Sequence, residues 1–119
     1  TLHITDSGGR VAHLRSGRRF RLPGLHFACP DAAPSGCTAS AEIWRVGRDG
    51  KPLRPAAAGE VALDAGERGD ALVVRIGPAT LRRLRARGRL TLLAHVTLRA
   101  AGASPATRVT RFRLVARLG

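Results

Sequence analysis

Two cysteines are the residues of this chain whose spacing most clearly suggests chemistry. Cys29 and Cys37 flank the turn-forming segment PDAAPSG, and each adjoins an alternating apolar pattern. Oxidation of such a pair closes a short loop and stabilises a fold by about 2–3 kcal/mol. The pattern predicts two adjacent antiparallel strands joined by a turn and linked by the disulfide. The alternative is a pair of free buried thiols in a cytosolic protein.

Basic side chains are the second group with a recognisable chemistry. The net charge is +13, and every one of the 21 basic residues except Lys51 is an arginine. Such a charge attracts polyanions. Two dense segments predict a polyanion patch: Arg18, Arg19, Arg21, Arg82, Arg83, Arg85, Arg87 and Arg89. Two alternatives remain open, namely a solvated arginine surface and the arginine bias of a GC-rich genome.

Histidines, acids and hydroxyls form no recognisable catalytic or metal-binding pattern. The four histidines are scattered, so they lack the paired short spacings of a zinc site. One acidic cluster lies in a glycine-rich loop at Glu60, Asp64, Glu67 and Asp70. Its oxygens suit calcium, but solvated turn acids explain it better. We therefore expect no enzyme, no cofactor and no metal.

The strands that position these residues can be predicted from the alternation of apolar and polar residues. Leu90, Leu92, Ala94, Val96 and Leu98 alternate with mostly polar residues. Thr110, Phe112, Leu114, Ala116 and Leu118 alternate with Val109, Arg111, Arg113, Val115 and Arg117. Residues 52–60 contain two prolines and predict a loop or short edge. Residues 78–87 predict one short helix that crosses between sheets, with Pro78 in its first turn and Gly88 as its stop. The sequence predicts an all-β antiparallel sandwich of about seven strands.

The length of 119 residues indicates one domain with one core. We predict that residues 1–17 form an N-terminal edge strand and that residues 18–119 form the sandwich. Leu2, His3 and Ile4 are the candidate assembly strand, because a sheet edge accepts a strand from a neighbour. No apolar run approaches the ~20 residues of a transmembrane helix. A chain that opens at Thr1 fits either a mature secreted protein or a domain cut from a longer one.

Residues 18–118 resemble a known group of modules in their pattern. The carrying features are a strand ending in Cys29-Pro30, Cys37 opening an alternating strand, the segment LRRLRARGRLTL and a Thr/Arg-rich hairpin. Together they are similar to immunoglobulin-like, fibronectin type III-like modules of secreted and surface proteins from high-GC actinobacteria. The resemblance implies cysteines that link neighbouring strands without bridging the sheets, an extracytoplasmic location and no catalytic residues.

Three functions follow from these observations. The first is a non-catalytic extracellular structural or adhesive module, either a spacer or a self-assembling surface subunit, whose partners are copies of itself or neighbouring domains. The second is an arginine-rich binding module for acidic polymers such as extracellular DNA or anionic cell-wall polysaccharide. The third is an accessory domain of a secreted enzyme. The sequence favours the first.

Overall fold

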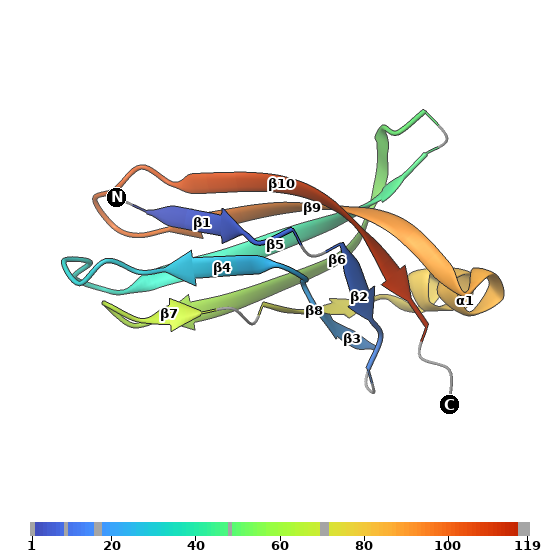
Figure 1. Ribbon diagram of the computed structural model, residues 1–119, viewed down its shortest axis with the longest axis horizontal. Coiled ribbons are helices and arrows are strands. Elements are labelled where there is room, and N and C mark those ends of the chain that lie inside the picture. The colour runs from blue at the N-terminus through green and yellow to red at the C-terminus, as the bar shows by residue number, and fades with distance from the viewer. Residues whose placement is uncertain (1, 9, 16–17, 48, 70–71, 117–119) are drawn as a thin grey trace.

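The computed structural model describes residues 2–8, 10–15, 18–47, 49–69 and 72–116 (Figure 1). The prediction for Leu118 therefore lies outside the described residues, as does that for Asp70. The strands are β1 (His3–Asp6), β2 (Val11–His13), β3 (Arg19–Arg21), β4 (Leu25–Ala28), β5 (Cys37–Val46), β6 (Pro52–Leu63), β7 (Arg68–Gly69), β8 (Val73–Ile76), β9 (Arg89–Arg99) and β10 (Ala106–Val115). The helix is α1 (Pro78–Arg87).

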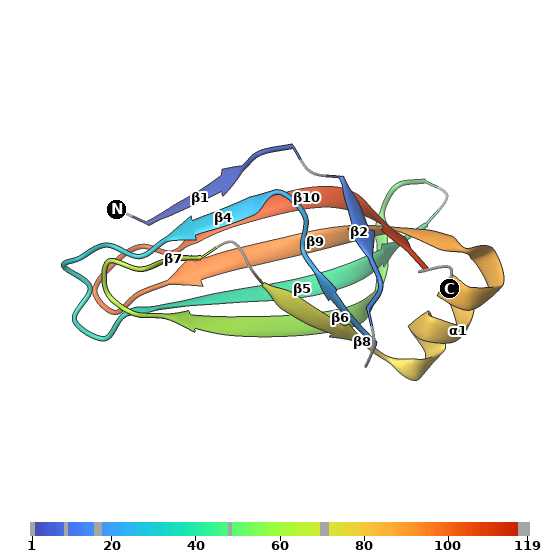
Figure 2. The same ribbon diagram turned by 60° about the horizontal axis from the view of Figure 1, so that its bottom comes forward.

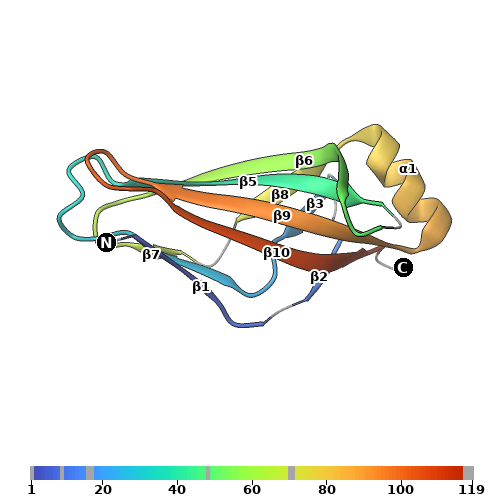
Figure 3. The same ribbon diagram turned by 90° about the horizontal axis from the view of Figure 1, so that it is seen from above.

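The strands form two sheets that pack as layers (Figure 3). The smaller sheet has the order β1-β4-β7, and the larger has the order β2-β10-β9-β5-β6-β8-β3. Among the described strands, β10 and β2 pair in parallel and all the other pairs are antiparallel. The predicted all-β sandwich is confirmed.

Three lengths of chain are each divided between the two sheets. β1 continues into β2, β3 into β4 and β7 into β8, and one member of each pair joins each sheet. The break between β3 and β4 falls at Pro23, which has no N–H to donate, and Gly24, whose φ is 72°. Hydrogen bonds from Ser7 N–H to the Gly24 carbonyl and from Leu22 N–H to the Leu72 carbonyl hold the crossing points together. The ten strands among the described residues therefore occupy seven lengths of chain, because three lengths each contain two strands, and this agrees with the expected number of about seven.

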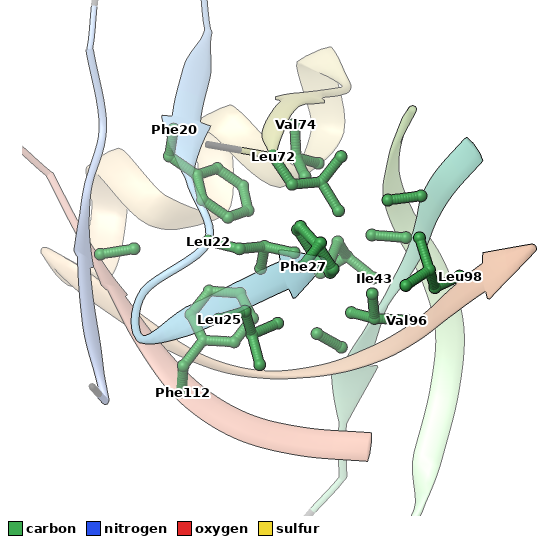
Figure 4. Packing of buried hydrophobic residues seen from close by; sticks show 14 of the residues in the cluster. Phe20, Leu22, Leu25, Phe27, Ile43, Leu72, Val74, Val96, Leu98 and Phe112 are labelled. Carbon is green, nitrogen blue, oxygen red and sulfur yellow. The ribbon is translucent and has the colours of Figure 1, made fainter. Parts of the chain in front are cut away.

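The core lies between the layers and is mostly aliphatic (Figure 4). Leu92, Ala94, Val96 and Leu98 of β9 are fully buried, which confirms the predicted inward alternation. Phe112 of β10 packs against Phe20 of β3, with ring centroids 5.5 Å apart. That aromatic contact joins β3, at one edge of the larger sheet, to β10, the second strand from the opposite edge.

The helix occupies the predicted residues but has a different connection. Pro78 begins it, and Gly88, with φ 78°, ends it by donating its N–H to the Leu84 carbonyl at 2.7 Å. It joins β8 to β9, which both belong to the larger sheet, so the expected crossing from one sheet to the other is wrong. The physical reason is that the chain has already changed sheets between β7 and β8. Helix α1 lies at one end of the sandwich (Figure 2).

Residues 52–60 were expected to be a loop or short edge, and this prediction is wrong. They belong to β6, which pairs with β5 along most of its length. Pro52 is the first residue of the strand, and Pro55 pairs with Trp44 where the register shifts. Strand ends and bulges are positions where a missing N–H breaks no regular ladder bond. The prolines are therefore compatible with a long strand.

The disulfide between Cys29 and Cys37 is confirmed, with 5.7 Å between the Cα atoms and both residues buried. The predicted hairpin around it is wrong. Cys29 follows β4 of the smaller sheet and Cys37 begins β5 of the larger sheet, so the disulfide bridges the two sheets. β5 pairs with the long strands β6 and β9, which cover much more of its backbone than the short β4 could.

Loss of this disulfide is expected to destabilise the fold without abolishing it. The double variant Cys29→Ala/Cys37→Ala loses the constraint that the short loop places on the unfolded chain, worth about 2–3 kcal/mol. Urea unfolding followed by circular dichroism measures the difference in the free energy of unfolding. Wild-type protein unfolded and refolded with reductant is the control, and it should match the variant to within about 1 kcal/mol. Equal urea midpoints for the oxidised wild type and the variant would contradict a stabilising role.

Candidate anion-binding site

A cleft of about 500 Å³ lies where the larger sheet meets α1. Its walls come from the end of β5, the following turn, one side of α1, the start of β9 and the end of β10. Six arginines line it: Arg45, Arg83, Arg87, Arg89, Arg111 and Arg113. We refer to it as the arginine cleft.

Strand alternation and helix periodicity bring these side chains together. On β10, Arg111 and Arg113 alternate with the buried Phe112 and Leu114, so they lie on the outer face of the sheet. Arg113 pairs with Thr91 of β9, which also lines the cleft. On α1, Arg83 and Arg87 are one turn apart and therefore share a face. The Arg111 guanidinium donates a hydrogen bond to the Gly50 carbonyl at 3.4 Å, which ties β10 to the β5–β6 turn.

The cleft carries positive charge that no carboxylate among the described residues compensates. Burial lowers the pKa of the Arg45 guanidinium below its usual range, and the nearby charges of Arg83, Arg54 and Arg87 lower it further. Within the part of the chain that the structure describes, no carboxylate forms an ion pair with any of the six arginines. A bound anion would relieve this repulsion. Guanidinium groups suit the task because each can donate two parallel hydrogen bonds to a carboxylate, sulfate or phosphate.

The predicted polyanion patch divides into separate regions. Arg83, Arg87 and Arg89 line the arginine cleft, whereas Arg82 and Arg85 are exposed on α1 without lining it. The N-terminal members Arg18, Arg19 and Arg21 lie at or beside β3, and Arg21 lines a different hollow together with Arg15 and His13.

Sequence reasoning missed three of the cleft's arginines, namely Arg45, Arg111 and Arg113. The alternation in β10 did place Arg111 and Arg113 on the outer face. Nothing in a single sequence shows that this face lies beside α1, because that neighbourhood arises from the strand order.

The candidate assembly strand is paired within the chain's own fold. His3 pairs with Ala28 and Ile4 pairs with Phe27, as part of the β1–β4 ladder. Leu2 is buried in the core, and Ala12 of β2 is buried as well, so the N-terminal segment contributes to the same core as the remaining domain. β1 is an edge strand of the smaller sheet, as the sequence suggested.

The described members of the acidic cluster, Glu60, Asp64 and Glu67, do not gather as a metal site. The Asp64 N–H donates to Oε1 of Glu67 at 3.2 Å, which makes these acids part of a turn. Among the described residues, no three His, Cys, Asp or Glu side chains gather as metal ligands. No described helix has the length and apolar character needed to cross a membrane.

Asp6 holds the one set of ion pairs found among the described residues. Its carboxylate accepts a hydrogen bond from Gly8 N–H at 2.8 Å and lies 3.5 Å from Arg10 and 4.0 Å from Arg108 of β10. The Gly8 hydrogen bond is the largest cause that lowers the pKa of Asp6, and both arginines add to it. Asp6 therefore links the end of β1 to the other sheet.

Asp6→Asn is expected to weaken the fold at neutral pH and to have no effect in acid. A carboxyl whose pKa is lowered on folding stabilises the protein above its unfolded-state pKa of about 3.9. That stabilisation is lost as the pH falls through the folded-state pKa. We expect a difference of about 1 kcal/mol at pH 7, since both arginines are half exposed and solvent screens them. Urea unfolding from pH 7 down to about pH 2 measures it. A difference that stays constant over this range would show that the charge of Asp6 is not its cause.

Two sheets pack face to face, and three lengths of chain contribute one strand to each sheet. This architecture defines the class: an immunoglobulin-like β-sandwich. No protein-family model and no curated protein matches the chain. A solution structure of an Arabidopsis thaliana protein is similar over 98% of this chain and 87% of that one, with a TM-score of 0.57 and 12% identity. At that identity the likeness shows the fold alone.

Two bacterial chaperones are also similar in structure. The periplasmic chaperone SfaE matches over 98% of this chain and 56% of its own, with 14% identity and a TM-score of 0.49. The E. coli chaperone DraB matches over 98% and 55%, with 15% identity and a TM-score of 0.45. The chain thus spans little more than half the length of these chaperones.

The comparisons correct the resemblance drawn from the sequence. The similar structures named above are two chaperones, one of them periplasmic, and a plant protein, and they give no support to fibronectin type III-like modules of actinobacterial surface proteins. That assignment is therefore wrong. The disulfide explains part of the error, because it bridges the sheets where the resemblance implied a link between neighbouring strands.

Proposed function

We propose that this protein is a non-catalytic, extracytoplasmic adhesive module that binds acidic polymers through the arginine cleft. The observation that carries the proposal is the gathering of six arginines in one cleft without a carboxylate partner among the described residues. Net charge alone would give diffuse attraction. A cleft with several guanidiniums offers in addition a defined place where anionic groups form directed hydrogen bonds.

The buried disulfide supports the extracytoplasmic part of the proposal. Structural disulfides form and persist in oxidising compartments, whereas the cytosol keeps thiols reduced. Cys29 and Cys37 are each 4% exposed and tie the two sheets together, so the bond belongs to the framework of the fold.

A pair of double variants on α1 tests the role of the cleft. Arg83→Gln/Arg87→Gln removes two cleft arginines, and Arg82→Gln/Arg85→Gln removes two exposed arginines from the same helix. Both lose the same net charge, so only position differs. We expect the first to weaken binding of heparin, used as a sulfated polymer, about tenfold at 0.1 M salt, which is ~1.4 kcal/mol. We expect the second to weaken it about twofold, and salt to weaken binding in both.

Isothermal titration calorimetry gives both affinities and their dependence on salt. Equal losses for the two variants would mean that only net charge matters, and the cleft would lose its assigned role. Circular dichroism before titration confirms that each variant is folded.

A self-assembling or spacer role is a second proposal, and the position of β1 favours it. β1 is at the edge of the smaller sheet, so one side of its backbone pairs with no other strand among the described residues. Edge strands accept strands from neighbouring molecules. Light scattering and electron microscopy at physiological salt test it: ordered polymers support assembly, and a monodisperse monomer contradicts it. An accessory role beside a secreted enzyme stays a prediction.

A further inference from the structure

A second hollow of about 480 Å³ adjoins the arginine cleft. Arg10, Val11 and Phe112 line it together with Thr91, Arg111 and Arg113. The last three also line the cleft, so the two hollows are continuous. We call the combined surface the arginine track.

The arginine track is an elongated path. It begins at Arg83 and Arg87 on α1, passes over β9 and β10, and ends beside β2. Helix α1, the start of β9, the end of β10 and β2 lie toward the same end of the molecule (Figure 1). β5, β9, β10 and β2 are successive neighbours in the sheet, so the path covers about 14 Å across strands before α1 extends it. One sulfate or carboxylate is far too small to use all of it.

The walls of the track offer little to an aromatic base. Phe112 is the aromatic residue among the described lining residues, and it is 2% exposed. Proteins that bind single-stranded nucleic acid usually present exposed aromatic rings on which bases stack. The track instead offers guanidiniums, the exposed Thr91 hydroxyl and the methyl groups of Val11, which is 46% exposed. Such a surface suits sugar rings, which combine hydroxyls with small apolar C–H faces.

We propose that the arginine track binds a single chain of anionic carbohydrate whose sulfate or carboxylate groups recur along its length. The chain lies across β9 and β10, from α1 toward β2. Arg113 and Arg111 stand at the junction of the two hollows, so they contact it at its middle. Arg10 is held by Asp6 and borders the far end. This inference rests on the proposed function and adds the class of polymer and its placement.

Titration with ligands of increasing length tests the placement. Heparin disaccharide, hexasaccharide and decasaccharide are compared at 0.1 M salt. We expect affinity to rise at least about tenfold from the disaccharide to the hexasaccharide, since only the longer chain reaches both hollows. Uronate oligosaccharides of the same lengths separate carboxylate from sulfate recognition. The double variant Arg111→Gln/Arg113→Gln should lose most of the gain with length.

Arg19→Gln/Arg75→Gln is the matched control, because these paired residues of β3 and β8 lie outside both hollows and carry the same charge. It should keep the dependence on length. Oligothymidylate with the same number of charges as the hexasaccharide tests the polymer class, and we expect it to bind at least about fivefold more weakly than the better of the two carbohydrates.

The outcomes separate this inference from the proposed function. Equal affinity for disaccharide and decasaccharide would overturn the extended placement, and equal or tighter binding of oligothymidylate would overturn the carbohydrate class. Either result leaves the arginine cleft as an anion site. Absence of binding by every ligand even at 20 mM salt would overturn both proposals.

Discussion

Val96→Asp is expected to leave the chain unfolded in water. Val96 is fully buried in the middle of β9, where it pairs with Ala41 of β5 and Arg108 of β10. The Arg108 side chain is half exposed and already lies beside Asp6. A carboxylate at position 96 would therefore lose its water without a free partner, at a cost of several kcal/mol even if it took up a proton. The lost valine packing adds to this cost. Domains of this kind are stable by about 5–15 kcal/mol, so one such change consumes most or all of the margin.

Leu114→Asp is expected to have the same result from a different position. Leu114 is fully buried on β10 and pairs with Leu90 on one side and with Ala12 of β2 on the other. An unfolded Leu114→Asp protein would show that the end of β10, where β2 pairs with it, needs an apolar side chain at position 114.

Thr107→Asp is the control for both variants. Thr107 is exposed on the outer face of β10 and pairs with Thr97, so an aspartate there stays in water. We expect a change below about 1 kcal/mol in the free energy of unfolding, because surface substitutions away from special features are small. Circular dichroism and urea unfolding of the three proteins measure the effects. A soluble and cooperatively folded Val96→Asp protein would contradict the inward position of Val96.

Period-two alternation made much of this fold predictable. β9 and β10 bury one residue in two over long stretches, because one face of each strand meets the core and the other meets water. The helix was predictable for a similarly local reason, since Pro78 and Gly88 fit its two ends. These signals lie within a few residues of the elements that they specify.

The errors arose where the partner of a segment decides its structure. Residues 52–60 have no periodicity of their own and become a strand because β5 offers a long ladder beside them. The turn between Cys29 and Cys37 looked like a hairpin, yet β5 pairs with β6 and β9 and leaves β4 to the other sheet. Local sequence cannot show which of two possible strand pairings is more stable, because the stability of each pairing depends on residues distant along the chain.

The candidate site was half predictable for the same reason. Arg83, Arg87 and Arg89 stood out because they are close in sequence, whereas Arg45, Arg111 and Arg113 join them only through strand order. Proximity in sequence also misled, because Arg82 and Arg85 belong to the same dense segment but lie outside the cleft. Because an α-helix has 3.6 residues per turn, Arg82 and Arg85 project from α1 in other directions than Arg83 and Arg87.

Gly59→Val is expected to cost at least about 3 kcal/mol of stability, because it adds atoms where two strands approach closely. A Cβ on Gly59 would overlap the carbonyl oxygen of Val73 and lie 3.2 Å from Cγ2 of Val74. The obstacle is mainly backbone, so it cannot move aside as a flexible side chain would. β8 pairs with β6 at Ala57 and Ala58, immediately before this point. Displacing β8 would also disturb Val74 and Ile76, which are buried in the core.

Gly77→Val is the matched control for this prediction. Gly77 precedes α1 with φ −77° and ψ 167°, a conformation that valine readily adopts, and a Cβ there would meet nothing within 4 Å. We expect a loss below about 1 kcal/mol, mainly because valine is a poorer residue than glycine at a helix N-cap. Urea unfolding of both variants compares the same chemical change at a crowded and an open position. Equal losses in the free energy of unfolding would mean that β8 can move away from a side chain at position 59 at little cost. The close approach of β6 to β8 would then not require glycine at this position.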